Sequence, residues 1–518
     1  MKNIDTIQNQ KGGIIRKNKR FLVVGGLMLV FGLMLVFTTT FLSHRTNGQT
    51  LKATEQNSGL LDNGKNADLN VNPRTAAASF ADIVEKASPA VVTIRADIVN
   101  QASEQDASPF FNNPLFRQFF GDRLPQGKPQ PRTEHALGSG VIVASDGTIL
   151  TNNHVVAGAE KIKVELSNRK TFDAKVIGTD PLSDLAVLKI EARDLPTLRL
   201  GDSDRVRVGD VVLAIGNPLG LQQTVTSGII SAKGRQTGLS DGSFEDFLQT
   251  DAPINQGNSG GALVDLNGDL IGINSQILSP SGGNIGIGFA IPSNMAKTVM
   301  DQLIKNGKVH RGMLGIGIQD ITSDLAENFG LKDENGVLVN SVSAGSPADK
   351  AGIKQGDVIT AVGGVKVGDS NELRNRVANT APGSDISLTI LRDGKEQSVN
   401  AKLTEFTLEK TGADRGNPGG GSADSQTGNQ LGVTLQSLTP EIASQLGLKD
   451  VSGGLVITEV GAGSKAEEAG LRRGDVILQI NRQNVSNPDE VKAALAKSGE
   501  KPALLLINRQ NQTIFVTV

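Results

Sequence analysis

The stretch "GNSGGALVDLNGDLIGIN" at residues 257–274 decides between two folds for this chain. Its serine, Ser259, stands among glycines, which is typical of a tight turn and also of a nucleophilic serine. Two short apolar runs follow on either side of Asn267-Gly268, a dipeptide that favours a two-residue hairpin turn. The stretch therefore predicts strand, turn and strand after the serine, without a helix.

Two arrangements of serine hydrolases compete for Ser259. The α/β-hydrolase elbow needs a helix directly after the serine, and then an acid and a histidine later in the chain. The chain has 4 histidines, and His310 alone follows Ser259, in a polar stretch far downstream. The chymotrypsin order of His, Asp and Ser fits instead, with His154 in "ILTNNHVV" and Asp184 in "DPLSDLAVLKI".

The chemistry of such a site gives each residue a role. The Ser259 hydroxyl becomes a good nucleophile only when a base takes its proton, and His154 is the candidate base and later the acid. Asp184 would hold the tautomer of His154 and stabilise the imidazolium. The backbone amides of Gly257 and Ser259 can point together at the tetrahedral oxyanion.

The pattern around these residues is that of a β protein. Short apolar runs separated by Gly, Asn, Asp and Pro continue from residue 138 to residue 292, and no helical pattern of crossover length interrupts them. This favours antiparallel barrels or sandwiches over a βαβ fold.

Composition excludes several classes of function. The formal net charge of −2 argues against electrostatic binding of nucleic acid. The absence of cysteine excludes disulfides, thiolate catalysis and cysteine metal sites. Because His, Asp and Glu do not cluster at ligand spacing and serine chemistry needs no cofactor, we expect neither a metal nor a cofactor.

The N-terminus predicts export. Residues 1–20 form a basic region, and residues 21–42 are apolar and uncharged, long enough to span a bilayer as a helix. They are either a membrane anchor, with the basic side in the cytoplasm, or a cleaved signal peptide. Residues 43–78 are polar and are interpreted as a linker.

The last third of the chain is duplicated. "GVLVNSVSAGSPADKAGIKQGDVITAV" (336–362) aligns with "GLVITEVGAGSKAEEAGLRRGDVILQI" (454–480). The Gly- and Ser-rich stretch 407–429 separates the two units and is typical of a flexible linker. The sequence thus predicts tandem domains over 311–406 and 430–518.

Residues 80–518 resemble the HtrA/Deg family of serine proteases, of the Do type with two PDZ domains. The resemblance lies in "LGSGVIV", "ILTNNHVV", "SDLAVLKI", "LQTDAPINQGNSGGALVDLNGDLIGIN" and the two "AG-(I/L)-xxGDVI" runs. It implies a mainly β fold: a chymotrypsin-like double β-barrel protease domain over 79–305, followed by two α+β PDZ domains.

The same resemblance implies a function. It indicates an ATP-independent serine endopeptidase of the periplasm that degrades misfolded or damaged exported proteins, is regulated through its PDZ domains and also acts as a chaperone. Unfolded proteins or peptides would be its partners, and it would assemble as a homotrimer or a multiple of trimers. The alternative is a proteolytically silent holdase or PDZ scaffold, against which the intact triad argues.

The resemblance also carries residues over. The Phe-rich segment 108–120 matches a loop from a neighbouring subunit, and Arg235 stands at the sensing position of a regulatory loop, 234–243. The second PDZ loop lacks the aromatic or basic residues that surround the first. Two roles therefore remain open for it, peptide binding or assembly. The implied sites are an oxyanion hole (Gly257, Asn258 and Ser259), an S1 pocket for small aliphatic side chains (Ile254, Ile277 and Leu278), a peptide-binding loop in the first PDZ domain (Gly312, Met313, Leu314, Gly315 and Ile316) and its counterpart in the second (Leu431, Gly432 and Val433).

Overall fold

The computed structural model describes nine stretches of the chain: 79–100, 132–217, 223–237, 243–255, 257–279, 283–407, 431–448, 453–498 and 502–518. The expectations for residues 1–78, for the Phe-rich segment 108–120 and for all but the first residue of the 407–429 linker lie outside these stretches. Among the described residues, no helix is both long and apolar enough to cross a membrane.

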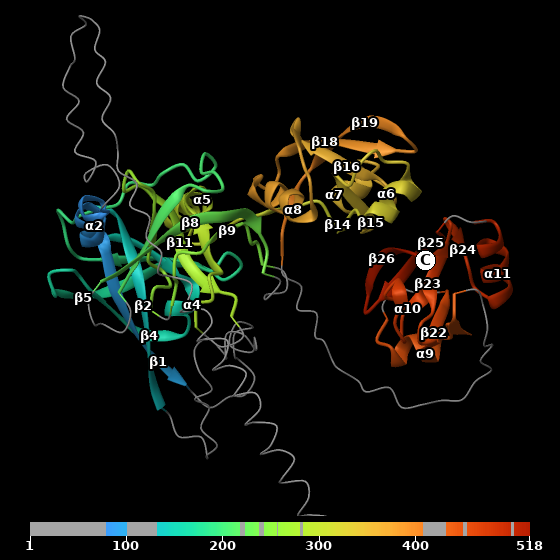
Figure 1. Ribbon diagram of the computed structural model, residues 1–518, viewed down its shortest axis with the longest axis horizontal. Helices are drawn as coiled ribbons and strands as arrows, with labels where there is room; N and C mark the ends of the chain where they lie inside the picture. Colours follow the sequence, from blue (N-terminus) through green and yellow to red (C-terminus); the bar gives the residue numbers. More distant parts are fainter. Residues whose placement is uncertain are drawn as a thin grey trace, which may run out of the picture. The chain divides into compact units, whose positions relative to one another are not determined.

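Two closed β-barrels form the first domain, as the alternating apolar runs predicted (Figure 1). Every pair of neighbouring strands in both barrels is antiparallel. The first barrel has the order β1-β2-β3-β6-β5-β4, with β1 (Val91–Asn100), β2 (Arg132–Ala144), β3 (Thr148–Asn152), β4 (Ala159–Glu165), β5 (Thr171–Asp180) and β6 (Leu185–Ile190). The second has the order β10-β11-β12-β9-β8-β7, with β7 (Val211–Gly216), β8 (Thr224–Arg235), β9 (Phe247–Thr250), β10 (Ala262–Val264), β11 (Leu270–Ile277) and β12 (Gly288–Pro292).

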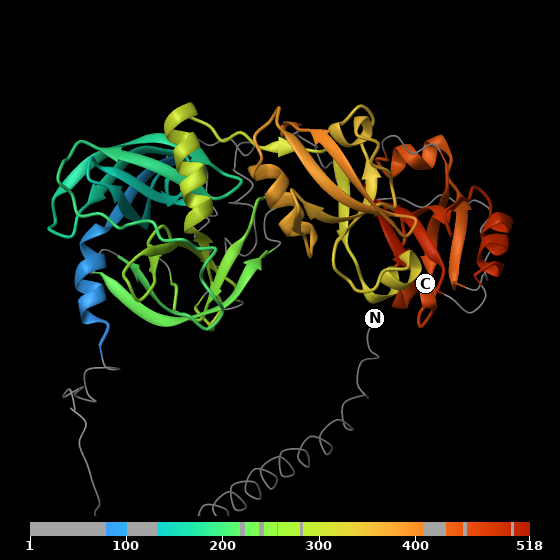
Figure 2. The same cartoon turned by 90° about the horizontal axis from the view of Figure 1, so that it is seen from above.

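The first domain also contains short helices, and one longer helix packs against both barrels. They are α2 (Ala81–Ala87), the 3-10 turn η1 (Ser88–Ala90), α4 (Asn153–Val156) and α5 (Ser293–Asn306). Helix α5 packs against β5 and β6 of the first barrel and β11 and β12 of the second (Figure 2, yellow-green). Its buried residues Ala296, Val299 and Leu303 recur at helical spacing on one face, so apolar burial holds it across both barrels.

Each of the duplicated units folds as a small sheet with helices. In the first, the strand order is β14-β15-β16-β18-β19, and in the second it is β21-β22-β23-β25-β26. The first unit has β13 (Gly312–Met313), β14 (Ile316–Asp320), α6 (Ser323–Phe329), β15 (Val337–Val342), α7 (Pro347–Lys350), β16 (Val358–Val362), β17 (Val365–Lys366), α8 (Ser370–Asn379), β18 (Asp385–Arg392), β19 (Lys395–Lys402) and β20 (Thr404–Glu405). The second has β21 (Val433–Ser437), α9 (Pro440–Gln445), β22 (Leu455–Val460), α10 (Lys465–Glu468), β23 (Val476–Ile480), β24 (Gln483–Asn484), α11 (Pro488–Ala496), β25 (Leu504–Arg509) and β26 (Gln512–Thr517).

A buried ion pair recurs at the same place in both units, as a duplication requires. Arg392 Nη2 lies 2.6 Å from Asp357 Oδ2, and Arg509 Nη2 lies 2.6 Å from Asp475 Oδ2. Each guanidinium makes two bonds to its carboxylate, and the paired carboxylate raises the pKa of both arginines.

The two units share a hydrophobic cluster in which the outer faces of their sheets meet. Leu338 belongs to this cluster, whereas its neighbours Val337 and Val339 face the core of the first unit. Leu504 and Leu506 in the second unit follow the same alternation, with Leu505 and Ile507 in its own core. Strands that are apolar on both faces are thus buried on both faces.

Candidate active site

His154 and Asp184 are brought together by the pairing of β3 with β6. The register places Asn152 opposite Leu185, so the residues just beyond these two lie at the same end of the barrel. His154 Nδ1 lies 2.7 Å from Asp184 Oδ2, and the His154 amide donates to Asp184 Oδ1 at 3.0 Å. Both side chains are buried, so water does not compete for this bond. The carboxylate therefore fixes a proton on Nδ1 and leaves Nε2 as the basic nitrogen.

Further donors hold the Asp184 backbone and carboxylate. The Asn153 amide donates to the Asp184 carbonyl at 3.1 Å, and Asn152 Nδ2 donates to the same oxygen at 3.0 Å. Ser275 Oγ donates to Asp184 Oδ2 at 3.2 Å. Asp184 has a left-handed backbone, with φ of 54°, a conformation that Asp tolerates better than most residues. The aspartate is thus oriented from three directions.

Ser259 lies in the turn before β10 and is nearly fully buried. Its Oγ donates to the Ser275 carbonyl at 2.9 Å, so Ser275 contacts both Ser259 and Asp184. In this arrangement the hydroxyl proton points at Ser275 rather than at His154. A rotation about one side-chain torsion is needed before His154 can take that proton.

The turn that carries Ser259 is anchored on the first barrel. The Ser139 amide donates to the Ser259 carbonyl at 2.8 Å, and Ser139 Oγ donates to the Gly257 carbonyl at 2.6 Å. Gly260 has φ of +81°, and a Cβ there would lie 2.1 Å from the Ser139 carbonyl oxygen. Glycine is therefore required at position 260, because it allows the two barrels to approach each other at the nucleophile.

Two backbone amides near Ser259 remain open. Among the described residues, neither Gly257 N nor Ser259 N donates to a protein acceptor. The Asn258 amide is occupied, because it donates to the Asn255 carbonyl at 3.0 Å. The expectation that Asn258 contributes to the oxyanion hole is therefore corrected: the free pair of donors is Gly257 and Ser259.

The three residues predicted to line the S1 pocket differ in their exposure. Ile254 and Ile277 are buried in one apolar cluster of the second barrel. A Cβ at Gly288 would lie 3.0 Å from Ile254 Cδ1, so this glycine leaves room beside the isoleucine. Leu278, just beyond β11, is 39% exposed. The structure thus brings two of the three together in the core and leaves Leu278 facing the surface.

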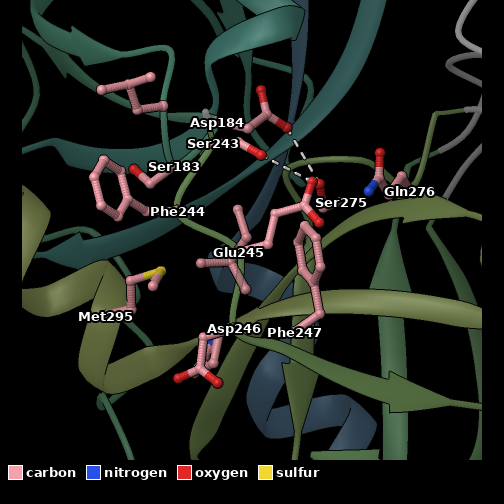
Figure 3. A pocket seen from close by; sticks show the side chains of 13 residues that line it. Ser183, Asp184, Ser243, Phe244, Glu245, Asp246, Phe247, Ser275, Gln276 and Met295 are labelled. Carbon is pink, nitrogen blue, oxygen red and sulfur yellow. Dashed lines mark hydrogen bonds between the residues drawn. The ribbon is translucent and has the colours of Figure 1, made fainter. Parts of the chain in front are cut away.

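A cavity lies beside Asp184 and Ser275. Asp184 and Ser275 stand at one end and Asp246 at the other, with the Asp246 carboxylate turned away from the triad (Figure 3). Phe244 and Phe247 supply aromatic walls. Within the described part of the chain, no group of acidic or histidine residues is arranged to hold a metal ion.

A buried ion pair joins the loop of Asp184 to the start of the first duplicated unit. Arg311 Nη1 and Nη2 donate to the two carboxylate oxygens of Asp180 at 2.9 and 2.5 Å. Asp180 also accepts from the amide and hydroxyl of Ser183, the residue before Asp184. The Arg311 guanidinium lies 4.6 Å from the centre of the Phe244 ring. The roles of Asp180, Arg311 and Ser275 were not predicted from the sequence, because their contacts join distant parts of the chain.

The segment predicted to be a regulatory loop contacts helix α8. Arg235 ends β8, and its Nε donates to Gln249 Oε1 at 3.2 Å. Asn371 of α8 donates to the Gly234 carbonyl at 3.4 Å, and Asn375 donates to the Glu245 carbonyl at 2.9 Å. Residues 238–242 of the expected loop lie outside the described stretches.

The two predicted peptide loops share one backbone geometry. Gly315 has φ of +75° and Gly432 φ of +77°, and a Cβ on either would lie about 2.5 Å from a serine side chain. Leu314 and Leu431 are buried, and Gly312 and Met313 form β13. Ile316 and Val433 then begin β14 and β21, each of which lies at the end of its sheet. An end strand has a free row of backbone groups that can pair with an added strand.

Comparison with known proteins agrees with this architecture. A trypsin-like peptidase domain family matches residues 138–273, and two PDZ domain families match residues 312–403 and 456–509. A probable periplasmic serine endoprotease, DegP-like, from Brucella abortus is 42% identical over 490 aligned residues, which cover 89% of this chain and 93% of the relative. The periplasmic pH-dependent serine endoprotease DegQ of Escherichia coli K12 is 44% identical over 442 residues, covering 85% of this chain and 90% of DegQ.

Solved structures of relatives agree as well. The HtrA-type protease AlgW with a decapeptide is 46% identical and covers 64% of this chain and 100% of its own, with a TM-score of 0.51. The same protease with a tripeptide is 42% identical and covers 64% and 99%, with a TM-score of 0.53. Given these identities over most of its length, the chain belongs to the HtrA-type, DegP-like family of periplasmic serine endoproteases.

Proposed function

We propose that this serine endopeptidase degrades misfolded or damaged exported proteins in the periplasm without ATP, and that the reaction uses Ser259, His154 and Asp184. One observation carries the assignment of residues: the Asp184 carboxylate 2.7 Å from His154 Nδ1, beside a buried Ser259 with two open amides. The substrate class follows from the family resemblance, and the PDZ domains give the chain a means of engaging extended peptide.

The reaction begins when Ser259 Oγ turns from the Ser275 carbonyl toward His154 Nε2 and attacks the scissile carbonyl carbon. His154 takes the hydroxyl proton and passes it to the leaving amine, which breaks the C–N bond and leaves an acyl-enzyme. Water then attacks the acyl group with His154 again as base. The amides of Gly257 and Ser259 donate to the oxyanion in both steps, which is worth about 3–4 kcal/mol per donor in serine proteases.

The pocket residues support a preference for small aliphatic side chains before the cleaved bond. Ile254 and Ile277 offer apolar surface and no charge. A substrate Arg or Lys placed there would lose its hydration without gaining a partner, so such sites should be cleaved poorly.

The PDZ domains are proposed to bind peptide C-termini at the loops before β14 and β21. The solved structures of the relative AlgW contain a decapeptide and a tripeptide, and two stretches of this chain match PDZ domain families. A peptide would add to the end strand and place its carboxylate against the loop amides. The family resemblance further supports assembly as trimers or multiples of trimers, a chaperone activity, and a membrane tether at residues 21–42 if they are retained.

The test of catalysis uses the purified protein lacking residues 1–43 and unfolded casein. We expect degradation by the parent and none by Ser259→Ala, while Ser398→Ala on exposed strand β19 serves as the matched control. Equal degradation by the parent and Ser259→Ala would refute the triad. An inert parent that still prevents casein aggregation would instead favour the holdase. Light scattering after size-exclusion chromatography measures the assembly.

A further inference from the structure

The carboxylate of Asp246 lies where the second barrel meets helix α8 of the first PDZ domain. Asp246 directly precedes β9 and is partly buried. Its Oδ1 lies 3.8 Å from where a Cβ would stand on Gly234. Gly234 and Glu245, its spatial and sequence neighbours, are the two residues whose carbonyls accept from Asn371 and Asn375 of α8. Asp246 thus lies beside the contact between the domains.

Negatively charged groups act on Asp246 from both of the domains that meet here. Asp204 lies on the barrel side, and Asp369 and Glu372 lie on α8. Lys233 of β8 is the cation among the groups that act on Asp246. Its Nζ donates to the backbone carbonyls of Asp204 and Val206 at 2.9 and 2.8 Å.

The two acidic residues at the start of α8 also have local partners. Glu372 Oε1 lies 2.7 Å from Arg376 Nη2, and its Oε2 accepts from the Gly368 amide at 2.9 Å. Asp369 caps α8 by accepting from the Glu372 amide at 2.8 Å.

These surroundings disfavour the ionised form of Asp246. Burial, and then the charge of Asp204, raise its pKa from 3.8 to about 6; Lys233 opposes the rise, and Glu372 and Asp369 add to it. A carboxyl whose pKa is raised in the docked state stabilises that state while it is protonated. The share of the rise that comes from Glu372 and Asp369 disappears on undocking, so protonated Asp246 stabilises the docked state, and this stabilisation is lost as the pH rises through about 6.

We propose that the contact between the protease domain and α8 is an acid-strengthened latch: protonated Asp246 allows the first PDZ domain to dock, and ionised Asp246 loosens it. This regulation goes beyond the proposed proteolysis and does not depend on which residues perform it. The latch adjoins the triad loop, because the Phe244 amide donates to the Leu182 carbonyl at 2.8 Å, two residues before Asp184.

The latch also holds the regulatory segment. The Glu245 carboxylate accepts from the Thr237 amide at 2.6 Å and from Ser243 Oγ at 3.1 Å, so it is engaged away from Asp246. Asn375 Nδ2 of α8 donates to the backbone carbonyl of Glu245. Docking and release of α8 would therefore change the contacts of Thr237 as well as those of the loop that carries Asp184.

The experiment measures docking directly rather than activity. The chain contains no cysteine, so a donor and an acceptor dye can be attached specifically at Lys175→Cys on β5 and Lys395→Cys on β19. Single-molecule energy transfer in the full-length Ser259→Ala protein, in detergent, reports the ratio of docked to undocked molecules. Because only the α8 charges leave on undocking, we expect this ratio to rise about 3- to 10-fold between pH 7.5 and pH 5.

Three variants identify the source of the response. Asp246→Asn should hold the docked ratio high and constant across this range. Asp369→Asn with Glu372→Gln, which keeps a capping side chain on α8, should reduce the response to less than half. Asp173→Asn, which removes an exposed carboxylate on β5, should behave as the parent.

Two results would overturn the latch. One is a parent-like pH response in Asp246→Asn, since a group other than Asp246 would then be responsible. The other is an unchanged response in the α8 double variant. Thermal unfolding by circular dichroism, expected within a few degrees of the parent for every variant, separates these results from misfolding.

Discussion

Replacing Gly260 by alanine should disturb the catalytic geometry of the protease domain while leaving the domain folded. Gly260 follows Ser259 directly and sits with φ of +81°. An added Cβ would lie 2.1 Å from the Ser139 carbonyl oxygen and 2.4 Å from Thr151 Oγ1. Neither neighbour is free to move, because Thr151 Oγ1 donates to that same carbonyl at 2.7 Å and the Ser139 amide donates to Ser259.

The displacement sets the size of the effect. Cβ atoms essentially never approach a heavy atom closer than 3.0 Å, so the turn must move by about 0.9 Å away from Ser139. A misplacement of about 1 Å at reacting groups costs on the order of 10²-fold in rate. The left-handed backbone adds about 1–2 kcal/mol of strain for alanine. We therefore expect kcat/KM to fall about 100-fold and the protein to remain folded.

The assay compares kcat/KM on a fluorogenic peptide with the midpoint of thermal unfolding. Gly307→Ala is the matched control, because Gly307 also has a positive φ, of +71°, but has no atom within 4 Å of the added Cβ. The control should lose about 1 kcal/mol of stability and keep its activity. A Gly260→Ala enzyme with kcat/KM within threefold of the parent would refute the argument from close approach.

Three further predictions rest on other contacts. Asp184→Asn should lower kcat/KM by about 10⁴-fold with unchanged thermal unfolding, because the amide favours the wrong tautomer of His154; a loss under tenfold would speak against the triad. Arg311→Met should destabilise the protein by about 3–5 kcal/mol by leaving the Asp180 carboxylate buried and unpaired, and adding Asp180→Asn should recover part of that loss in chemical denaturation; no recovery would contradict the pairing. Phe515→Ala should weaken the cluster between the two PDZ domains, where its ring packs edge-on against Phe329 at 5.5 Å; faster hydrogen exchange in β26 and α6 is expected, with β18 unchanged as the internal reference.

The sequence predicted the fold class and the family, and both are confirmed. Alternating apolar runs and the Asn267-Gly268 turn were enough, because strand periodicity and hairpin chemistry are local properties. The duplication could also be recognised from the sequence, because the second unit repeats the residue pattern of the first. The catalytic roles of His154, Asp184 and Ser259 and the domain bounds stay predictions, for which the geometry now supplies specific tests.

The residues that support the site could not be predicted in this way. Arg311 and Asp180 form their pair across a large separation in sequence, and nothing near either residue indicates the other. The family resemblance implied Asn258 as part of the oxyanion hole, yet the Asn258 amide donates to the Asn255 carbonyl. The direction of a single amide depends on the torsions of the whole turn, which residue types do not specify.

The sequence by itself determined the barrels, the tandem domains, the order of His154, Asp184 and Ser259, and the glycines that a tight nucleophile turn needs. Local propensity and chain order suffice for these features. Only the tertiary structure decided that the Ser259 hydroxyl donates to Ser275, that Gly257 and Ser259 are the open amides, and that Asp246 lies beside the contact with α8. Each of these depends on which distant groups share a small volume. Burial there, rather than residue type, sets the hydrogen-bond partners and the pKa.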